Sequence, residues 1–147
     1  MSCLATLHHS VAVVGAVIEG DRALCIQRAD NRHWEAPAGV LEKDESLFEG
    51  VAREVLEETG YTVQPLFITG VHKNHAHPLR PVSITIRCRV LDGDSRTSDE
   101  TVAVEWLSKN EVRQRMTTVH AARLLDAWEA DAGVVPRSHD GIEFDDR

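Results

Sequence analysis

The sequence predicts an α/β domain whose mixed β-sheet lies between helices. Apolar runs and helical patterns follow one another in the order strand, strand, helix, strand, strand, helix. The chain has 147 residues, 42% of them apolar, so one domain can bury a sizeable core. We assign this domain to residues 1–132 and expect residues 133–147 to be a polar C-terminal tail, either loose or folded over the site.

The first two predicted strands form a hairpin. Residues 11–18 are β-branched and nearly all apolar, which indicates a central strand that is buried on both faces. A turn at residues 19–21 leads into a second strand at residues 23–28. The first segment is too short to span a membrane, and it lacks the basic region and the cleavage site of a signal peptide.

A helix is predicted after the turn residues 37–39. Phe48, Val51 and Val55 recur at helical spacing and give this helix a stripe that faces the core. Gly60 is the residue type most common just beyond a helix C-terminus, so we expect the helix to end there.

The second half of the chain is predicted to hold three more strands and two short helices. They are an edge strand at residues 62–71 that contains Pro65, an alternating strand at residues 82–91, a short strand at residues 101–106, and two helices capped by Ser108 and by Thr117 or Thr118.

Three acidic residues crowd one face of the first predicted helix. Glu54, Glu57 and Glu58 stand at positions i, i+3 and i+4, where like charges destabilise a helix by roughly 0.2–0.5 kcal/mol per pair. A divalent cation that prefers oxygen ligands, such as Mg²⁺, would offset this repulsion. Taken alone, the three residues favour a solvated acidic face over a metal site, because such helix faces are common.

The spacing around these acids favours the cation. Gly39, five residues, Glu45, seven residues and the segment 53–60 (REVLEETG) together resemble the signature of the Nudix hydrolases. This resemblance implies a Nudix-type α/β/α sandwich with a mixed β-sheet. It also implies a loop–helix–loop that holds Mg²⁺ (or Mn²⁺) against a diphosphate.

The resemblance gives the matching residues their expected roles. The expected metal ligands are the carbonyl oxygen of Gly39 and the carboxylates of Glu54, Glu57, Glu58 and Glu100. The same four glutamates are the expected catalytic residues, and Glu54 or Glu100 would activate the attacking water. Asp99 is the alternative to Glu100 as the loop carboxylate, while Glu45 and Arg53 would brace the loop and the helix.

Four residues outside the signature are candidates for substrate binding: Arg28, Trp34, Lys73 and His75. For Trp34, packing is favoured over base stacking because large aromatic side chains mainly bury area. Residues 72–77 contain three histidines, but neither a cysteine nor an acid lies near them. We therefore favour a polar loop over a zinc site, with Lys73 or a histidine contacting substrate phosphate.

The family resemblance implies hydrolysis of a diphosphate bond by attack of water at phosphorus. The first hypothesis is a nucleoside diphosphate linked to another moiety, such as ADP-ribose or a nucleotide sugar. A nucleoside-triphosphate pyrophosphohydrolase is the nearer alternative. A non-catalytic nucleotide-binding module is the alternative outside enzymes, and the retained glutamates argue against it.

Charge and cysteine content limit the partners and the compartment. The formal net charge of −8 argues against binding to nucleic acid or to an anionic membrane surface. Three scattered cysteines without metal-ligand spacing suit reduced thiols in a cytoplasmic protein. A homodimer is compatible with the sequence.

Overall fold

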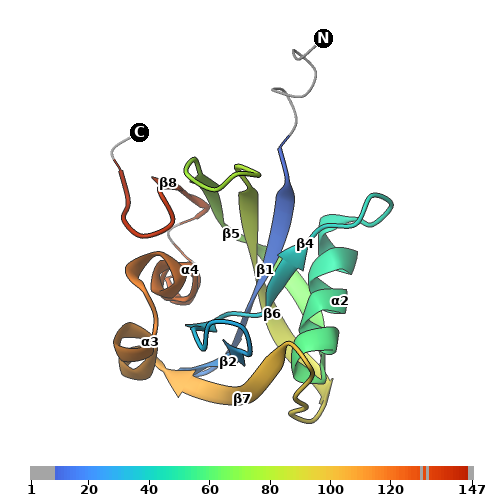
Figure 1. Cartoon of the computed structure of the whole chain (residues 1–147). Helices are drawn as coiled ribbons and strands as arrows, with labels where there is room; N and C mark the ends of the chain where they lie inside the picture. The colour runs from blue at the N-terminus through green and yellow to red at the C-terminus, as the bar shows by residue number, and fades with distance from the viewer. Residues whose placement is uncertain (1–8, 130, 132, 146–147) are drawn as a thin grey trace.

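The computed structural model describes residues 9–129, 131 and 133–145, which form an eight-stranded mixed sheet with helices on both sides (Figure 1). The elements are β1 (Val11–Glu19), β2 (Arg22–Arg28), β3 (Trp34–Glu35), β4 (Ala38–Val40), α2 (Leu47–Thr59), β5 (Tyr61–Asn74), β6 (Val82–Gly93), β7 (Thr101–Ser108), α3 (Lys109–Arg115), α4 (Thr118–Trp128) and β8 (Val135–His139). Helix α2 covers one face of the sheet, and α3 and α4 lie on the other side (Figure 1). The predicted α/β architecture is confirmed.

Strand β1 lies at the centre of the sheet, where the sheet divides. One edge of β1 pairs in parallel with β6 over residues 11–17. The other edge pairs with β4 over residues 12–14, but with β2 only at Ile18 and Glu19. Strand β2 pairs along its length with β7 instead. The predicted hairpin is therefore only two residue pairs long. Beyond these two pairs, β2 diverges from β1, so that β2 and β4 are separated from each other.

Two hydrophobic clusters, one on each face of the sheet, hold the helices in place. Successive residues of β1 point to opposite faces, so Val13 packs with Val51 and Val55 of α2, whereas Val14 packs with Leu124 of α4. All five side chains are fully buried. Because helices cover both faces of the sheet, both faces of β1 are buried, and a nearly all-apolar strand is stable in this position.

Helix α2 has a defined start and a defined end. The hydroxyl of Ser46 accepts a hydrogen bond from the backbone N–H of Glu49, whose side chain in turn accepts from the N–H of Ser46. Gly60 follows the last turn with φ 86°, in the left-handed region, and its N–H donates to the carbonyl of Leu56. The predicted end of the helix is therefore confirmed.

The C-terminal segment, expected as a polar tail, contributes a strand. Residues 135–139 form β8, which pairs in parallel with residues 70–74 of β5. Strand β5 is thus an edge only over its first part, around Pro65, because β8 covers the remainder. Strands β3, β4 and β8 were not predicted.

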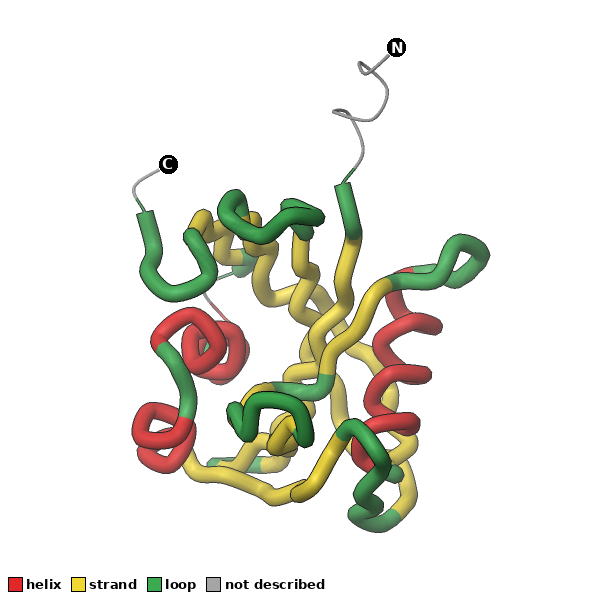
Figure 2. Tube along the Cα trace, viewed as in Figure 1, coloured by secondary structure: helices red, strands yellow, loops and turns green. Residues whose placement is uncertain are grey.

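Loops from distant parts of the chain meet beside α2. Figure 2 shows the loop at residues 29–33 and the loop at residues 94–100 (both green) in front of the sheet. The backbone N–H of Ala29 donates to the carbonyl of Glu100 at 2.8 Å, which ties the two loops together. Their junction closes one side of the space left where β2 and β4 separate.

Two further findings concern the whole chain. Cys25 and Cys88 are buried and carry free thiols, whereas Cys3 lies outside the described residues. No helix in the described part of the chain combines the length and the apolar character that a membrane crossing requires.

Candidate active site

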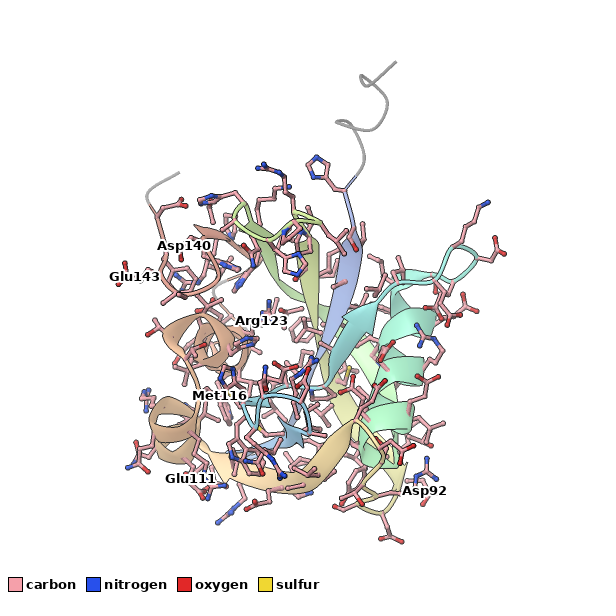
Figure 3. The ribbon with its side chains drawn as sticks, viewed as in Figure 1. Asp92, Glu111, Met116, Arg123, Asp140 and Glu143 are labelled. Atoms are coloured by element: carbon pink, nitrogen blue, oxygen red, sulfur yellow. The ribbon has the colours of Figure 1, made fainter. Side chains whose placement is uncertain are left out.

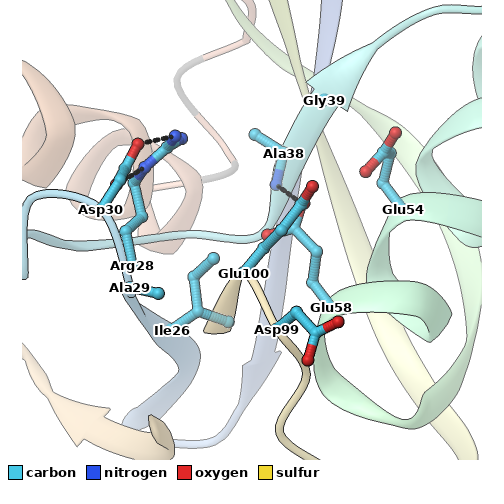
Figure 4. A pocket seen from close by; sticks show the side chains of 10 residues that line it. All are labelled: Ile26, Arg28, Ala29, Asp30, Ala38, Gly39, Glu54, Glu58, Asp99 and Glu100. Atoms are coloured by element: carbon cyan, nitrogen blue, oxygen red, sulfur yellow. Dashed lines mark hydrogen bonds and ion pairs between the residues drawn. The ribbon is translucent and has the colours of Figure 1, made fainter. Parts of the chain in front are cut away.

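A pocket of about 550 Å³ opens between helix α2 and the two joined loops (Figure 4). Its lining residues are Ile26, Arg28, Ala29, Asp30, Ala38, Gly39, Glu54, Glu58, Asp99 and Glu100. They come from the end of β2 and the loop after it, from β4, from α2 and from the loop before β7. The pocket therefore brings together six residues that the sequence singled out for chemistry: Arg28, Gly39, Glu54, Glu58, Glu100 and its alternative Asp99.

Gly39 lies so close to Glu54 that any side chain at position 39 would clash with the Glu54 carboxylate. A Cβ atom added to Gly39 would stand 2.2 Å from Cδ and Oε1 of Glu54. Strand β4 carries this glycine past the helix by pairing it with Val13 of β1. The missing side chain thus leaves the space that the Glu54 carboxylate occupies beside the β4 backbone.

Glu58 is the second carboxylate of the pocket, one helical turn after Glu54. The backbone N–H of Ala38 donates to its Oε1 at 3.1 Å, a contact drawn as a dashed line in Figure 4. Burial, followed by the charge of Glu54, raises the pKa of Glu58 to about 9, although the Ala38 hydrogen bond acts in the opposite direction. The protein alone therefore places two carboxylates together with too little positive charge to keep both ionised.

Arg53 ties the loop before α2 to the helix. Its guanidinium contacts the Glu45 carboxylate at 2.5 and 2.9 Å and Oε1 of Glu54 at 2.7 Å. Glu45 also accepts a hydrogen bond from the N–H of Glu42 at 2.9 Å. The hydrogen bond from Arg53 lowers the pKa of Glu45 to about 2, so Glu45 stays ionised. This is the geometry expected of a bracing pair.

Glu57 lies at the outer edge of the acidic face. Its side chain is 59% exposed, its carboxylate stands 3.3 Å from Arg53, and it does not line the pocket. In this arrangement, no three His, Cys, Asp or Glu side chains within the described residues converge as a metal-binding group. Glu54, Glu58 and the Gly39 carbonyl nevertheless offer only oxygen donors, which fits a hard cation that keeps several of its waters.

Glu100 and Asp99 face α2 from the opposite wall of the pocket. Both lie on the loop before β7, and Figure 4 shows Glu100 in front of Glu58 with Asp99 below it. The hydroxyl of Ser98 accepts from the N–H of Glu100 at 3.3 Å and helps to shape the loop. Both loop acids line the pocket, so the structure leaves both as candidates.

Arg28 is the one basic residue among the lining residues that the structure describes. Asp30 holds its guanidinium through two contacts of 2.9 and 2.7 Å, and Oε1 of Glu35 lies at 3.3 Å (Figure 4 shows the Asp30 contacts). Asp30 was not predicted as a site residue. Asp30 follows Arg28 by only two residues, but the sequence does not show that the chain turns there and brings the two side chains together.

The other three substrate candidates lie outside the pocket. Trp34 packs against the core under α4, and Arg115 lies over its ring at 5.1 Å, which agrees with the packing role favoured for it. Lys73 donates to the carbonyl of Arg80 at 2.9 Å, and Nε2 of His75 contacts the carboxylate of Asp145. The structure does not bring Lys73 or His75 to the pocket, because the long strand β5 carries them to another part of the sheet.

Known proteins resemble this chain over most of its length. The family model described as the NUDIX domain matches residues 7–128. A MutT-like protein of Streptomyces ambofaciens is 52% identical over 134 residues, covering 90% of this chain and 85% of that protein. An ADP-ribose pyrophosphatase of Methanocaldococcus jannaschii is 29% identical over 109 residues, covering 71% of this chain and 64% of that protein. The crystal structure of an ADP-ribose pyrophosphatase from Streptococcus suis matches with a TM-score of 0.76 at 24% identity, covering 88% of this chain and 99% of that one.

Proposed function

Because the chain belongs to the NUDIX family and is a pyrophosphohydrolase, we propose that it hydrolyses the diphosphate of a nucleoside diphosphate linked to another moiety, with Mg²⁺ or Mn²⁺ as cofactor. The ADP-ribose pyrophosphatase among its relatives supports ADP-ribose, or a similar nucleotide conjugate, as the substrate. A single observation carries the proposal: in one pocket, Glu54 and Glu58 face a space whose only described lining cation is Arg28.

The metal-binding role follows from the chemistry of the donor set. Gly39, Glu54 and Glu58 would hold the cation from the pocket, with Glu57 added from the helix edge and Glu100 from the opposite loop. When bound, the cation neutralises phosphate oxygens and makes a coordinated water more acidic.

The remaining roles belong to side chains of the protein. Arg53 orients Glu54 through a contact of 2.7 Å, which keeps this carboxylate directed past Gly39. Glu54 or Glu100 would accept the proton of the attacking water at a carboxylate oxygen. Arg28 would bind a phosphate oxygen of the substrate in place of the Asp30 carboxylate that it now contacts.

The volume of the pocket and the state of the cysteines also support this proposal. A pocket of about 550 Å³ is within the range that binds small molecules, roughly 300–1,000 Å³. The buried free thiols of Cys25 and Cys88 support a cytoplasmic protein, since such thiols persist in a reducing compartment.

The test is a substrate panel in ¹⁸O-labelled water with product analysis by mass. The panel contains ADP-ribose, nucleotide sugars, dinucleoside polyphosphates and nucleoside triphosphates, each with Mg²⁺ and with EDTA. We expect cleavage of a conjugate into a nucleoside monophosphate and a phosphorylated fragment, with ¹⁸O in one of them. Preferred release of pyrophosphate from a triphosphate would replace the proposed substrate by the alternative one.

Variants connect the activity to the pocket. Glu54→Gln and Glu58→Gln keep the size of each side chain and remove its charge, so both should lose most of the Mg²⁺-dependent rate. Glu129→Gln is the matched control, because Glu129 is exposed and lies after α4, away from the lining residues. Full activity in both pocket variants would overturn the proposal.

A further inference from the structure

Glu35 is a buried acid beside the pocket that the proposed chemistry does not use. Its side chain is 11% exposed, whereas that of Asp30, the other acid in contact with Arg28, is 61% exposed. Burial raises the pKa of Glu35, and the charges of Arg28 and Arg123 counteract this increase. Acidic side chains are rarely buried unless they are paired, so the position of Glu35 next to Arg28 requires an explanation.

The strand register brings Glu35 next to Arg28. Strand β3 pairs with β2 in the antiparallel sense, and Glu35 stands opposite Ile26. Arg28 follows Ile26 by two residues, so the two side chains point to the same face of β2. Residues in such a diagonal position can touch when one of them has a long side chain. The N–H of Arg28 also donates to the carbonyl of His33 at 2.9 Å, which extends the pairing to the last residue of β2.

The two acids hold different edges of the Arg28 guanidinium. Asp30 accepts hydrogen bonds from Nε at 2.9 Å and from Nη2 at 2.7 Å, whereas Glu35 accepts from Nη1 at 3.3 Å. The edge formed by Nε and Nη2 has the two parallel donors that match two oxygens of a phosphate. Asp30 lines the pocket, so this edge is accessible to a ligand there. A phosphate in the place of Asp30 would leave the contact between Nη1 and Glu35 intact.

The surroundings make Asp30 the exchangeable acid and Glu35 the permanent one. Asp30 lies in the loop after β2, and water can solvate its exposed carboxylate when it leaves Arg28. Glu35 lies on a paired strand, and its buried carboxylate would lose a charged donor if Arg28 moved away. The contact with Glu35 is therefore the one that should persist when a substrate binds.

Helix α4 attracts Glu35 through the other carboxylate oxygen. Oε2 of Glu35 lies 3.7 Å from Nδ1 of His120, while Oε1 contacts Arg28. Nδ1 of His120 lies 3.4 Å from Nη1 of Arg123, which Figure 3 shows on the side of α4 that faces the sheet. Burial lowers the pKa of Arg123, and the charge of Glu35 counteracts this decrease. The attraction to Arg123 keeps the Glu35 carboxylate from following Arg28 towards the pocket.

We propose that Glu35 is a positioning residue, which fixes the Arg28 guanidinium so that its Nε–Nη2 edge receives a phosphate of the substrate. The identity of that phosphate rests on the proposed function. The substrate displaces Asp30 from this edge, and Glu35 keeps its contact with Nη1 throughout. Glu35 acts through Arg28 alone, because it does not line the pocket. A donor that is already oriented loses less conformational entropy when the substrate binds.

A double-mutant cycle separates positioning from a general structural role. KM and kcat for the best substrate of the panel are measured with Mg²⁺ in the wild type, Glu35→Gln, Arg28→Gln and the double variant. Arg28→Gln should raise KM at least about tenfold, since it removes a charged donor. Glu35→Gln should raise KM about fivefold with little change in kcat, and it should have no further effect once Arg28 is replaced. An equal rise of KM in both backgrounds, or no rise in Glu35→Gln, would overturn the proposal.

The matched control is Glu105→Gln. Glu105 lies on β7, outside the pocket lining, and its carboxylate contacts Arg115 at 3.4 Å, so this exchange also separates a glutamate from an arginine. It should leave KM unchanged. Thermal melts of all variants record the structural cost, which Glu35→Gln should show because Arg123 loses the charge of this acid. A smaller folded fraction lowers the apparent kcat but not KM, so the two effects remain separable.

A second variant tests the same role with Glu35 unchanged, so its result does not depend on whether Glu35→Gln folds. Arg28→Lys keeps the positive charge on a side chain that is 44% exposed, but an ammonium group lacks the two edges of a guanidinium. It cannot hold Glu35 and a phosphate in one fixed geometry. KM should rise nearly as much as in Arg28→Gln. A wild-type KM in Arg28→Lys would show that charge alone suffices, and the proposal would be wrong.

Binding of inorganic pyrophosphate distinguishes a failure of this inference from a failure of the proposed function. Titration calorimetry with Mg²⁺ gives Kd for the same proteins, and Kd should follow the pattern expected for KM. If no panel compound is hydrolysed, the proposed function is wrong, but weaker pyrophosphate binding in Glu35→Gln that depends on Arg28 would still support positioning. If hydrolysis occurs and Glu35→Gln matches the wild type in both KM and Kd, only the positioning role is lost.

Discussion

Gly39 approaches the Glu54 carboxylate so closely that its replacement should be felt in catalysis. In Gly39→Ala, the new Cβ would stand 2.2 Å from Glu54, so the carboxylate must move. A displacement of about 1 Å in a catalytic constellation can lower a rate by about 100-fold, and we expect a loss of that size in kcat/KM. Hydrolysis rates and a circular dichroism spectrum would measure activity and folding.

The control for this variant is Gly70→Ala in β5. A Cβ at Gly70 would meet its nearest atom, the carbonyl oxygen of Val135, at an ordinary 3.5 Å. This variant should keep its activity. Equal activities in Gly39→Ala and Gly70→Ala would show that the position of Glu54 is not critical.

Glu58 should make the metal-free protein less stable as the pH rises. Its pKa is raised from 4.5 to about 9 by burial and by Glu54, so the folded state binds a proton that the unfolded state has already lost. Stability is therefore highest below about pH 4.5 with respect to this group, and it declines as the pH rises towards 9. Each unit of pKa difference corresponds to about 1.4 kcal/mol of unfolding free energy. Solvent screens the interaction between Glu58 and Glu54, which are partly exposed, so we expect a total loss of about 2–3 kcal/mol.

Urea unfolding in EDTA between pH 5 and 9 would measure this decline. Glu58→Gln cannot ionise at this position, so its stability should change less over the same range, and it should exceed that of the wild type at pH 9. A wild-type profile parallel to that of Glu58→Gln would contradict the assignment.

Asp30 should compete with substrate for Arg28. The two side chains are joined by contacts of 2.7 and 2.9 Å, and the Asp30 side chain is 61% exposed. Exposed ion pairs contribute at most about 1 kcal/mol, so Asp30→Asn should lower KM by up to about fivefold and leave kcat nearly constant. Steady-state kinetics would detect this, and Arg28→Gln should shift KM in the opposite direction. A raised KM in Asp30→Asn would mean that Asp30 helps to bind the substrate.

For single residues, the sequence predicted the position of a side chain well where that position depends only on spacing along one helix. Glu54 and Glu58 are four residues apart, so they project to nearly the same side and both reach the pocket. Glu57 is offset around the helix and turns to Arg53, which is also four residues away. The positions of Lys73 and His75 could not be predicted, because they depend on how strand β5 crosses the sheet.

Among the elements, local signals predicted helices better than strand partners. The capping pair Ser108 and Glu111 and the glycine after α2 are encoded within a few residues, and they appear as expected. Strands β3, β4 and β8 are short and depend on pairing with distant segments, which the local pattern does not contain. Strand β2 likewise pairs mainly with β7, more than 70 residues later along the chain. The pocket exists because of these distant pairings.

The junction of α2 with β5 should be sensitive to the size of residue 60. Gly60 has φ 86°, and an added Cβ would stand 2.3 Å from the carbonyl oxygen of Asp94. Gly20 also has a positive φ, 61°, but nothing lies within 4 Å of its added Cβ. Gly20→Ala should therefore cost about 1 kcal/mol from backbone strain alone, whereas Gly60→Ala should cost about 2 kcal/mol more because of the clash. Urea unfolding would give both values, and equal losses would mean that the loop at Asp94 yields freely.

In the molecule as a whole, the acidic pocket and the net charge act in the same direction. The α2 face presents Glu54 and Glu58 to the pocket. A substrate that contains phosphate is repelled by these carboxylates, and the net charge of −8 adds to the repulsion. Binding on the α2 face therefore requires added positive charge, which connects metal binding to both stability and protonation.

Mg²⁺ should stabilise the whole fold and displace a proton. A ligand at 100 times its Kd raises the unfolding free energy by about 2.7 kcal/mol, so melts with Mg²⁺ should shift upward. At pH 7, Glu58 with its pKa of about 9 is protonated without metal, and coordination requires the carboxylate, so close to one proton should be released. Calorimetry in buffers with different ionisation enthalpies would count that proton. Glu129→Gln should behave as wild type, whereas Glu58→Gln should release no proton and gain little stability, because no ionisable oxygen remains there to meet the cation.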